Sequence, residues 1–455
     1  MKKVFLTISR GSIARNVLQN DFYRLLRNQY QVRLVTTAAT DERFRKEFGH
    51  PNVSYIAFQE QDHTWADRWL FFLHKNLVYN STVAQKNRWG SPGNPKSKQP
   101  SWLSYIIKRI IFFPLSHIHW LRDIVRFLDQ LLLQKREITT FKKLLQQEKP
   151  DLVIVTNITS DTEVALLKAA EQLGIHTIAM PKSWDNLSKH GFRIKVDRLI
   201  VWSQFMKEQA ERFQNYSTTK IEVIGIPQFD CYADRRRLVS REEFCRWYGL
   251  DPNKKIIFFG SEGKLFPTDA EIAAILYEYT SSHGDQLLLR PHYGYRNDEK
   301  KFSALVGKPG VTVDLFNNPS AYFRDEWDYS EAFNSRFMNT LHHSDIIINT
   351  CSTLSLDAVA FDKPIISIGF DGYTKKPYHS SILRWYETDY YRAVLATGAV
   401  DVARSKAELF SLIDASKANP TRRASERKIL RERFCGPIDG KAGERFFKII
   451  QQYLK

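Results

Sequence analysis

Two hydroxyl residues and one acid follow a run of isoleucines in the second half of the chain. Ile346–Ile348 is typical of a buried strand, and Ser352, Thr353 and Asp357 come after it, at the start of an expected short helix. In that position the hydroxyls can cap the helix, while free backbone N–H groups and the positive end of its dipole attract a diphosphate. Asp357, one turn further, could accept a hydrogen bond from a ribose hydroxyl. A plain helix cap and a solvated acid would use the same residue types.

Two further loops with binding chemistry follow expected strands in the same half. The first is Gly260–Glu262, and the second contains Arg290 and His292. A guanidinium group binds phosphate oxygens in a fork, and glycine lets a ligand approach the backbone closely. Because the carboxyl ends of parallel strands share one edge of a sheet, these loops are expected to converge with the Ser352 loop. Taken alone, Arg290 would more often form a structural ion pair.

The first half also carries polar residues after two expected strands. They are Ser12, in the loop after the first strand, and Trp184, Asp185, Asn186 and Lys189, in the loop Pro181–Gly191. Open α/β sheets bind ligands beyond the carboxyl ends of their strands, so both loops are candidates for substrate contact. A glycine followed by Ser12 would also suit an ordinary tight turn, and Asp185 would suit a cap of its own loop.

The size and charge of the chain limit the kinds of protein it can be. Its 455 residues are enough for two domains with good cores, and 43% hydrophobic and 26% charged residues are normal for a globular chain. A formal net charge of +17 indicates an anionic partner. The signatures of nucleic-acid modules are not evident, which leaves phosphorylated substrates or an anionic membrane face. The four cysteines show neither zinc-ligand spacing nor a disulfide framework.

Strands and helices are expected to alternate along most of the chain. The N-terminal apolar run is broken by Arg10 and is interpreted as a first strand at 3–8, followed by one helix at 14–28. The alternation continues in two halves, which predicts an α/β fold with two Rossmann-like domains that face each other across a cleft. The expected boundaries are 1–230 for the first domain, 231–438 for the second and 439–455 for a terminal helix.

Residues 64–143 interrupt this alternation and have a different composition. The segment is rich in aromatic residues and contains a polar loop at 90–101. Its charges leave no uninterrupted apolar stretch of about 20 residues, so it is not expected to span a membrane. One or two amphipathic helices are expected, with apolar Trp102, Ile106, Ile107, Ile110 and Phe113 and basic Lys108, Arg109, Arg122, Arg126, Lys135 and Arg136. Such helices either lie in the headgroup region of a membrane or pack on the first domain.

The spacing of these motifs resembles that of a known family. Trp184-Asp185-Asn186 with Lys189 resembles a Trp-His-Gly loop, Arg290-Pro291-His292 resembles a His-Pro loop, and Ser352-Thr353 with Asp357 resembles a hydroxylated helix start. In these features the chain is similar to GT-B glycosyltransferases, and more narrowly to the CDP-glycerol glycerophosphotransferase-like group of bacterial surface polysaccharide and teichoic acid synthesis. The likeness covers about residues 150–450. Asp185 stands where that group has histidine, and Tyr293 where it has proline, which favours sugar transfer over glycerol-phosphate transfer.

The resemblance implies a role for each candidate residue. The donor-binding set is Gly260, Ser261, Glu262, Arg290, Ser352, Thr353 and Asp357, and the acceptor-side set is Ser12, Trp184, Asn186 and Lys189. Asp185 is implied as the general base on the acceptor hydroxyl, and His292 as a ligand of the donor phosphate or a structural hydrogen bonder. No metal and no cofactor are expected, and nucleic acid is not an expected partner.

Together these residues imply an enzyme that moves a sugar from a nucleotide-activated donor to a surface polysaccharide or a lipid-linked glycan. The expected location is cytoplasmic, at the inner face of the cell membrane, with the 64–143 segment docked on anionic lipid. One alternative is a CDP-glycerol-type transferase of glycerophosphate or another polyol phosphate. The other is a non-catalytic scaffold of the same fold that binds glycans or lipids.

Overall fold

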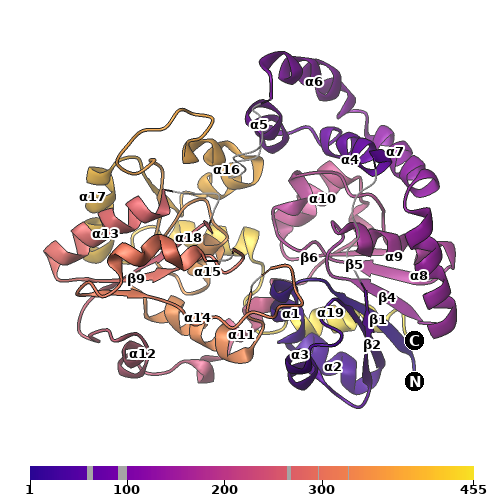
Figure 1. Ribbon diagram of the computed structural model, residues 1–455, viewed down its shortest axis with the longest axis horizontal. Helices are drawn as coiled ribbons and strands as arrows, with labels where there is room; N and C mark the ends of the chain where they lie inside the picture. Colours follow the sequence, from indigo (N-terminus) through magenta and orange to yellow (C-terminus); the bar gives the residue numbers. More distant parts are fainter. Residues whose placement is uncertain (59–64, 91–99, 264–267, 296, 326) are drawn as a thin grey trace.

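Two parallel sheets form the framework of the protein (Figure 1). The computed structural model describes residues 1–455 except 59–64, 91–99, 264–267, 296 and 326. Within these residues the first sheet has seven strands, all parallel, in the order β3-β2-β1-β4-β5-β6-β7. The strands are β1 (Lys3–Ile8), β2 (Gln31–Thr36), β3 (Val53–Ala57), β4 (Leu152–Val155), β5 (His176–Ala179), β6 (Arg198–Val201) and β7 (Ile221–Val223).

The second sheet, again within the described residues, has six parallel strands in the order β10-β9-β8-β11-β12-β13. The strands are β8 (Ile256–Gly260), β9 (Gln286–Arg290), β10 (Val311–Val313), β11 (Ile346–Asn349), β12 (Ile365–Ile368) and β13 (Asp401–Ala403). Parallel strands covered by helices on both faces are continuous apolar runs, and β11 is buried along its whole length. The predicted α/β class with two Rossmann-like sheets is confirmed.

The helices of the first domain cover both faces of its sheet. They are α1 (Gly11–Leu18), α2 (Asp21–Gln29), α3 (Glu42–Phe48), α9 (Asp161–Gln172) and α10 (Gln204–Gln214). The single helix predicted at 14–28 is wrong, because the chain leaves helical geometry at Asn20. There the backbone is extended and the Asn20 side chain accepts a hydrogen bond from the Phe22 N–H at 3.1 Å, which starts a new helix.

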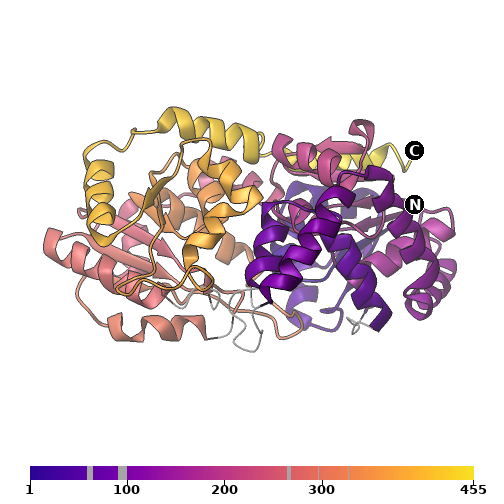
Figure 2. The ribbon, with the colours of Figure 1, turned by 90° about the horizontal axis from the view of Figure 1, so that it is seen from above.

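The second domain extends to α18, after which the end of the chain returns to the first domain. Its helices are α11 (Asp230–Ala233), α12 (Arg241–Tyr248), α13 (Asp269–His283), α14 (Glu331–His343), α15 (Leu354–Ala360), α16 (Asp389–Leu395), α17 (Lys406–Ala418) and α18 (Ala424–Phe434). The sequence analysis missed α18, whose many charges hide its apolar face. After α18 the C-terminal part of the chain, yellow in Figure 2, crosses to the first domain. There α19 (Ala442–Gln451) packs on α2, with the Phe446 and Phe22 rings stacked at 4.0 Å.

The described residues of the segment 64–143 are mostly helical and lie at one end of the first domain (Figure 1). Its helices are α4 (Trp65–Asn76), α5 (Ser81–Trp89), α6 (Trp102–Leu115), α7 (His119–Leu132) and α8 (Lys135–Glu148). Most of the polar loop predicted at 90–101 lies outside the described residues. In the part of the chain that is described, none of the helices has the length and apolar character needed to cross a bilayer. Helix α5 contacts α16, so this insertion touches both domains.

Two basic residues predicted for the exposed face of the insertion are buried, which corrects that prediction. Arg122 and Arg126 are each 6% exposed and point from α7 toward the first domain. Arg122 donates to the Arg212 carbonyl oxygen at 2.9 Å, and Arg126 donates to the Phe192 carbonyl oxygen at 2.8 Å. A guanidinium with five donors can satisfy several backbone carbonyls at once, which makes its burial tolerable. These arginines therefore hold the insertion in place.

A buried ionic cluster around Asp129 completes this attachment. The carboxylate of Asp129, on α7, accepts hydrogen bonds from His74 Nε2 at 2.9 Å, Lys168 Nζ at 2.5 Å and Arg193 Nε at 2.8 Å. Burial opposes its charge, but the hydrogen bonds from His74 and Arg193 outweigh that effect and hold the pKa of Asp129 well below its ordinary value. The cluster thus joins α4 and α7 of the insertion to α9 and to the loop that follows β5.

Replacing Asp129 by asparagine should lower the free energy of unfolding by about 3 kcal/mol, because it leaves buried Lys168 without its ion-pair partner and leaves Arg193 with only Asp161 and Asp67. Chemical denaturation of parent and variant at neutral pH measures the difference. Since the folded-state pKa of Asp129 is depressed, its contribution should be present near neutrality and fall as the pH is lowered through the acidic range. An equal stability of the two proteins at pH 7 would contradict a stabilising role for the cluster.

Candidate active site

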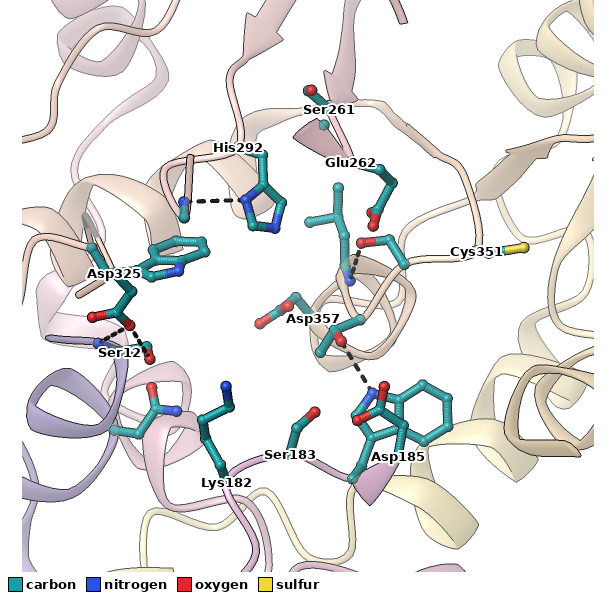
Figure 3. Close-up of a pocket in the computed structure, with 18 of the residues that line it drawn as sticks. Ser12, Lys182, Ser183, Asp185, Ser261, Glu262, His292, Asp325, Cys351 and Asp357 are labelled. Carbon is teal, nitrogen blue, oxygen red and sulfur yellow. Dashed lines mark hydrogen bonds between the residues drawn. The ribbon is translucent and has the colours of Figure 1, made fainter. Parts of the chain in front are cut away.

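A cavity of about 640 Å³ lies between the two domains, beyond the carboxyl ends of strands from both sheets (Figure 3). Its lining includes, from the first domain, Ser12, Trp184, Asp185 and Lys189 and, from the second, Gly260, Ser261, Glu262, Arg290, His292, Ser352, Thr353 and Asp357. Asn186 is the one predicted residue outside this lining. Its side chain accepts a hydrogen bond from the Ser183 N–H at 2.9 Å and so shapes the loop that carries Asp185.

The strand order explains why these loops converge. In the second sheet β8 and β11 are neighbours, while the chain after β8 runs outward to β9 and β10 and the chain after β11 runs outward to β12 and β13. Between such strands the connecting helices lie on opposite faces and leave a crevice, where open α/β sheets bind ligands. Glu262 follows β8 and Ser352 follows β11, so both belong to the two loops that border the crevice.

The helix start after β11 differs in detail from the prediction. Ser352 Oγ accepts a hydrogen bond from the Leu354 N–H at 3.2 Å and caps α15. The Thr353 side chain makes no cap, because its hydroxyl accepts a hydrogen bond from Trp184 Nε1–H at 3.1 Å. Trp184 is 2% exposed and also packs against the Tyr390 and Phe434 rings, so it is buried and presents no open face to an acceptor.

Asp357 lies one turn into α15 and is already partnered. Its carboxylate accepts a hydrogen bond from the Tyr232 hydroxyl at 2.7 Å. Burial raises the pKa of Asp357 to about 6, although Tyr232, Arg15 and Arg290 oppose that rise. A carboxylate has room for several hydrogen bonds, so a ribose hydroxyl can still bind its second oxygen.

Arg290 combines a structural contact with a free donor. Its Nη1 pairs with Asp314 at 3.2 Å, and its guanidinium lies 4.2 Å from the centre of the Phe337 ring. The side chain is 6% exposed, yet its Nη2 has no hydrogen-bond partner among the described atoms. A buried N–H without an acceptor costs about 1–3 kcal/mol, which a bound anion in the cavity would recover.

His292, on the same side of the cavity as Arg290, is a neutral hydrogen-bond donor. Its Nδ1 accepts the Gly294 N–H at 3.1 Å, so the proton of the neutral ring is on Nε2. Burial lowers the pKa of His292 to about 4, which keeps the ring neutral near pH 7. Nε2 carries a proton in this tautomer and is therefore a hydrogen-bond donor, not a base.

Asp185 lies on the first-domain side of the cavity, opposite Arg290 and His292. One of its carboxylate oxygens forms an ion pair with Lys189, and the other, Oδ1, has no hydrogen-bond partner among the described atoms. Burial favours the neutral acid, but Lys189 and the Ser183 hydroxyl outweigh it, so the pKa of Asp185 lies below its ordinary value. Asp185 is thus an ionised carboxylate with one oxygen free to accept a proton.

Sequence reasoning missed several charged residues of the cavity. They are Arg15, Lys86, Lys182 and Asp325. Asp325, from the second domain, accepts hydrogen bonds from the Gly11 N–H at 2.7 Å and the Ser12 hydroxyl at 2.6 Å (Figure 3). Burial and the charges of Lys189 and Lys75 lower the pKa of Lys86 to about 7. Arg15 lies in α1, Lys86 in the insertion and Asp325 in the loop between β10 and α14, and no local motif marks them. Lys182 lies in the loop after β5, within the candidate loop Pro181–Gly191, but was not itself singled out.

The fold and the site together define a class. Two Rossmann-like domains whose strand ends face one cavity, lined by a carboxylate and by buried hydrogen-bond donors, have the architecture of a GT-B transferase. In the described residues no group of three or more His, Cys, Asp and Glu side chains is arranged to hold a metal ion.

Solved structures with the same fold match over nearly the full chain at low identity. Staphylococcus aureus MnaA with UDP has a TM-score of 0.55 at 13% identity, covering 100% of this chain and 97% of that one. UDP-GlcNAc 2-epimerase from Neisseria meningitidis, bound to UDP-GlcNAc, has a TM-score of 0.55 at 12% identity, covering 100% and 99%. The wall teichoic acid polymerase TagF, soaked with CDPG, has a TM-score of 0.51 at 13% identity, covering 100% and 88%. These matches establish the GT-B fold.

A search of curated protein sequences found no match. The sequence model described as CDP-Glycerol:Poly(glycerophosphate) glycerophosphotransferase matches residues 169–452, which is more than half of the chain. The protein therefore belongs to the CDP-glycerol:poly(glycerophosphate) glycerophosphotransferase family. It is a GT-B transferase that transfers a glycosyl or polyol-phosphate group from a nucleotide-activated donor.

Proposed function

We propose that the protein transfers a sugar from a nucleotide-activated donor to a hydroxyl of a surface polysaccharide or a lipid-linked glycan. The observation that carries this proposal is Asp185, an ionised carboxylate whose Oδ1 has no hydrogen-bond partner among the described atoms and which faces Arg290 and His292 across the cavity. In the proposed reaction the acceptor hydroxyl gives its proton to Oδ1 and attacks the sugar carbon, while the nucleotide leaves with the bonding electron pair. Arg290 Nη2–H and His292 Nε2–H bind the departing phosphate oxygens.

The donor occupies the second domain in this proposal. Ser352, Asp357 and Arg290 surround the crevice between β8 and β11, and Asp357 is assigned to the ribose. The cations of the first domain, Lys86 and Lys182, face the cavity from the acceptor side. Charge on the leaving group is balanced by these side chains, so the proposed reaction uses no metal ion.

The second candidate is transfer of glycerophosphate or another polyol phosphate from a CDP-linked donor. The description of the family favours it, and TagF, which shares the fold, was soaked with CDPG. The same base and the same phosphate donors would serve attack on phosphorus in place of carbon. Asp185 and Tyr293, which replace the histidine and proline of that group, are the reason we place sugar transfer first.

Nucleotide binding separates an enzyme from a scaffold of the same fold. At about 100 times its dissociation constant, the matching nucleotide should stabilise the protein by about 2.7 kcal/mol, seen as a rise in melting temperature. The panel is UDP, GDP, CDP and CMP, followed by transfer assays with the sugar or glycerol derivative of the nucleotide that binds. A rate unchanged by EDTA is expected. A flat thermal response to all four nucleotides would favour the scaffold, and transfer from CDP-glycerol alone would favour the second candidate.

We also propose that the insertion docks the protein on an anionic membrane at the cytoplasmic face. Most of the large apolar side chains that the described residues expose lie on α4, α6 and α7. On α7 the usual polarity is inverted, because Arg122, Arg126 and Asp129 face inward while an apolar stripe faces out. The stripe consists of Trp120, Ile124, Phe127, Leu128, Leu131 and Leu132, each 39–63% exposed.

The charge beside this surface indicates which partner covers it. Helix α6 has no acidic residue, and its Lys108 and Arg109 stand next to exposed Ile107 and Ile110. Aromatic and aliphatic side chains next to cations match the headgroup region of an anionic bilayer, where each cation contributes about 1 kcal/mol. Docking there would bring a lipid-linked acceptor close to the cavity, which α5 of the same insertion borders through Lys86.

A further inference from the structure

Glu262 lies on the side of the cavity assigned to the nucleotide donor and forms no ion pair with any of the described residues. It follows β8 and lies close to Ser352, on the neighbouring loop of the crevice. Arg290 and His292, which could have paired with it, use other partners, namely Asp314 and the Gly294 N–H. This side of the cavity therefore presents several hydrogen-bond donors and one carboxyl group toward the space assigned to the phosphates of the nucleotide.

Behind Glu262, one lysine already faces two buried acids. Lys301 lies between two buried acids, 2.7 Å from Asp298 and 3.3 Å from Asp269. The Ser261 hydroxyl bridges the same acids, with oxygen–oxygen distances of 2.8 Å and 2.7 Å. One ammonium thus serves two carboxyl groups, and a third negative charge at Glu262 would have no counterion in this cluster. Desolvated like charges at such a site favour a proton on one of the acids.

We infer that Glu262 meets the donor as a neutral carboxylic acid and donates a hydrogen bond from its O–H to a phosphate oxygen of the donor. This inference rests on the proposed function. Phosphate oxygens only accept hydrogen bonds, so every group that binds them must donate, as Arg290 Nη2–H and His292 Nε2–H do. An ionised Glu262 on the same side of the cavity would repel the phosphate, whereas the neutral acid adds a third donor.

The electrostatic surroundings agree with the neutral form. Burial, together with the charges of Asp269 and Asp185, raises the pKa of Glu262 to about 8, although Ser352 and Lys301 oppose the rise. The other titratable groups that face it are Tyr295, Tyr390, Tyr391 and Cys351, and burial raises the pKa of each, so they stay neutral. Because the donor would bind the protonated form, its affinity should fall as the pH rises through about 8.

The test is the pH dependence of nucleotide binding in the parent and in Glu262→Gln, measured by calorimetry with the nucleotide that stabilises the parent. Glutamine keeps a neutral donor at the same place but cannot ionise. The ratio of the parent Kd to the variant Kd should rise about tenfold or more between about pH 7.5 and about pH 9.5. Both proteins share Lys86 and Lys182, so the ratio removes their titration. Glu262→Ala, which lacks the donor, should bind about tenfold more weakly than the parent at about pH 7.5.

Two results would overturn the inference while leaving the proposed function intact. A constant ratio across this pH range would mean that Glu262 does not titrate at the bound nucleotide. A Glu262→Gln variant that binds tenfold more weakly at about pH 7.5 would mean that an ionised carboxylate is needed, for instance to accept from a ribose hydroxyl. If the parent binds none of the four nucleotides at either pH, the proposed function itself fails and the inference fails with it.

Discussion

Asp185→Asn should lower kcat by about 100-fold or more while the dissociation constant of the donor nucleotide stays close to that of the parent. Asparagine has nearly the same shape, so the loop after β5 keeps its form, but its amide oxygen cannot take a proton at neutral pH. The loss then appears in the chemical step and not in donor binding. The measurement is the transfer rate at saturating donor and acceptor, because a defect in acceptor binding could otherwise imitate the effect.

The matched control is Asp21→Asn, which removes an exposed carboxylate on α2 whose described ion pair is with Arg24. It should leave kcat unchanged, since α2 does not border the cavity. Because the pKa of Asp185 is depressed, its ionised form persists through the mildly acidic range, and the parent should lose no activity there through this group. If Asp185→Asn keeps a near-parental kcat, Asp185 is not the general base and only shapes its loop.

Several elements of the fold could be read from the sequence because local pattern and tertiary burial agree there. Strand β1 at Lys3–Ile8 and strand β11 at Ile346–Asn349 lie where their apolar runs predict them. In a doubly wound α/β protein each strand is a short apolar run and each helix follows it closely, so the pattern repeats. The break between α1 and α2 was missed because the periodicity continues through Asn20, and the stop lies in a single side-chain cap.

The site was predictable in part for the same reason. Loops after strands β8, β9 and β11 converge by topology alone, so their polar residues could be placed on one edge. The partners of those residues could not be placed. Thr353 binds Trp184 from the other domain, and Asp325 reaches Ser12 across more than 300 positions of the chain. Contacts of this kind depend on the packing of the two domains, which no local spacing records.

The orientation of α7 shows another limit of sequence reasoning. Its amphipathic pattern was visible, but the pattern does not say which face points inward, and the usual assumption places arginines in solvent. Here Arg126 binds the Phe192 carbonyl, and the His74 carbonyl accepts the Gly191 N–H at 2.9 Å. Both contacts hold the loop that carries Asp185. The insertion thus connects an exposed apolar surface directly to the proposed base.

Replacing Trp120, Phe127 and Leu131 on α7 by serine should reduce partition onto anionic vesicles by about 100-fold or more. These side chains are 63%, 59% and 52% exposed, so the change removes no core packing. Each apolar side chain that enters the headgroup region contributes about 1 kcal/mol or more, and three together amount to about 3 kcal/mol, or slightly over two decades in affinity. Sedimentation with vesicles that contain phosphatidylserine, at low and high salt, measures the loss.

The control replaces Val306, Leu315 and Ile429 by serine, three apolar side chains that are 65%, 64% and 52% exposed elsewhere on the protein. It should bind vesicles as the parent does, and both triple variants should bind nucleotide normally. Adding Lys108→Glu and Arg109→Glu to the parent should weaken binding and remove most of its salt dependence, because the attraction of these cations to anionic lipid is screened by salt.

If the parent fails to sediment with such vesicles at low salt, the membrane is not what covers α7. A protein partner would then be the remaining explanation, and a shift of the parent to a larger species in size-exclusion chromatography, lost in the α7 variant alone, would identify a second copy of this chain as that partner.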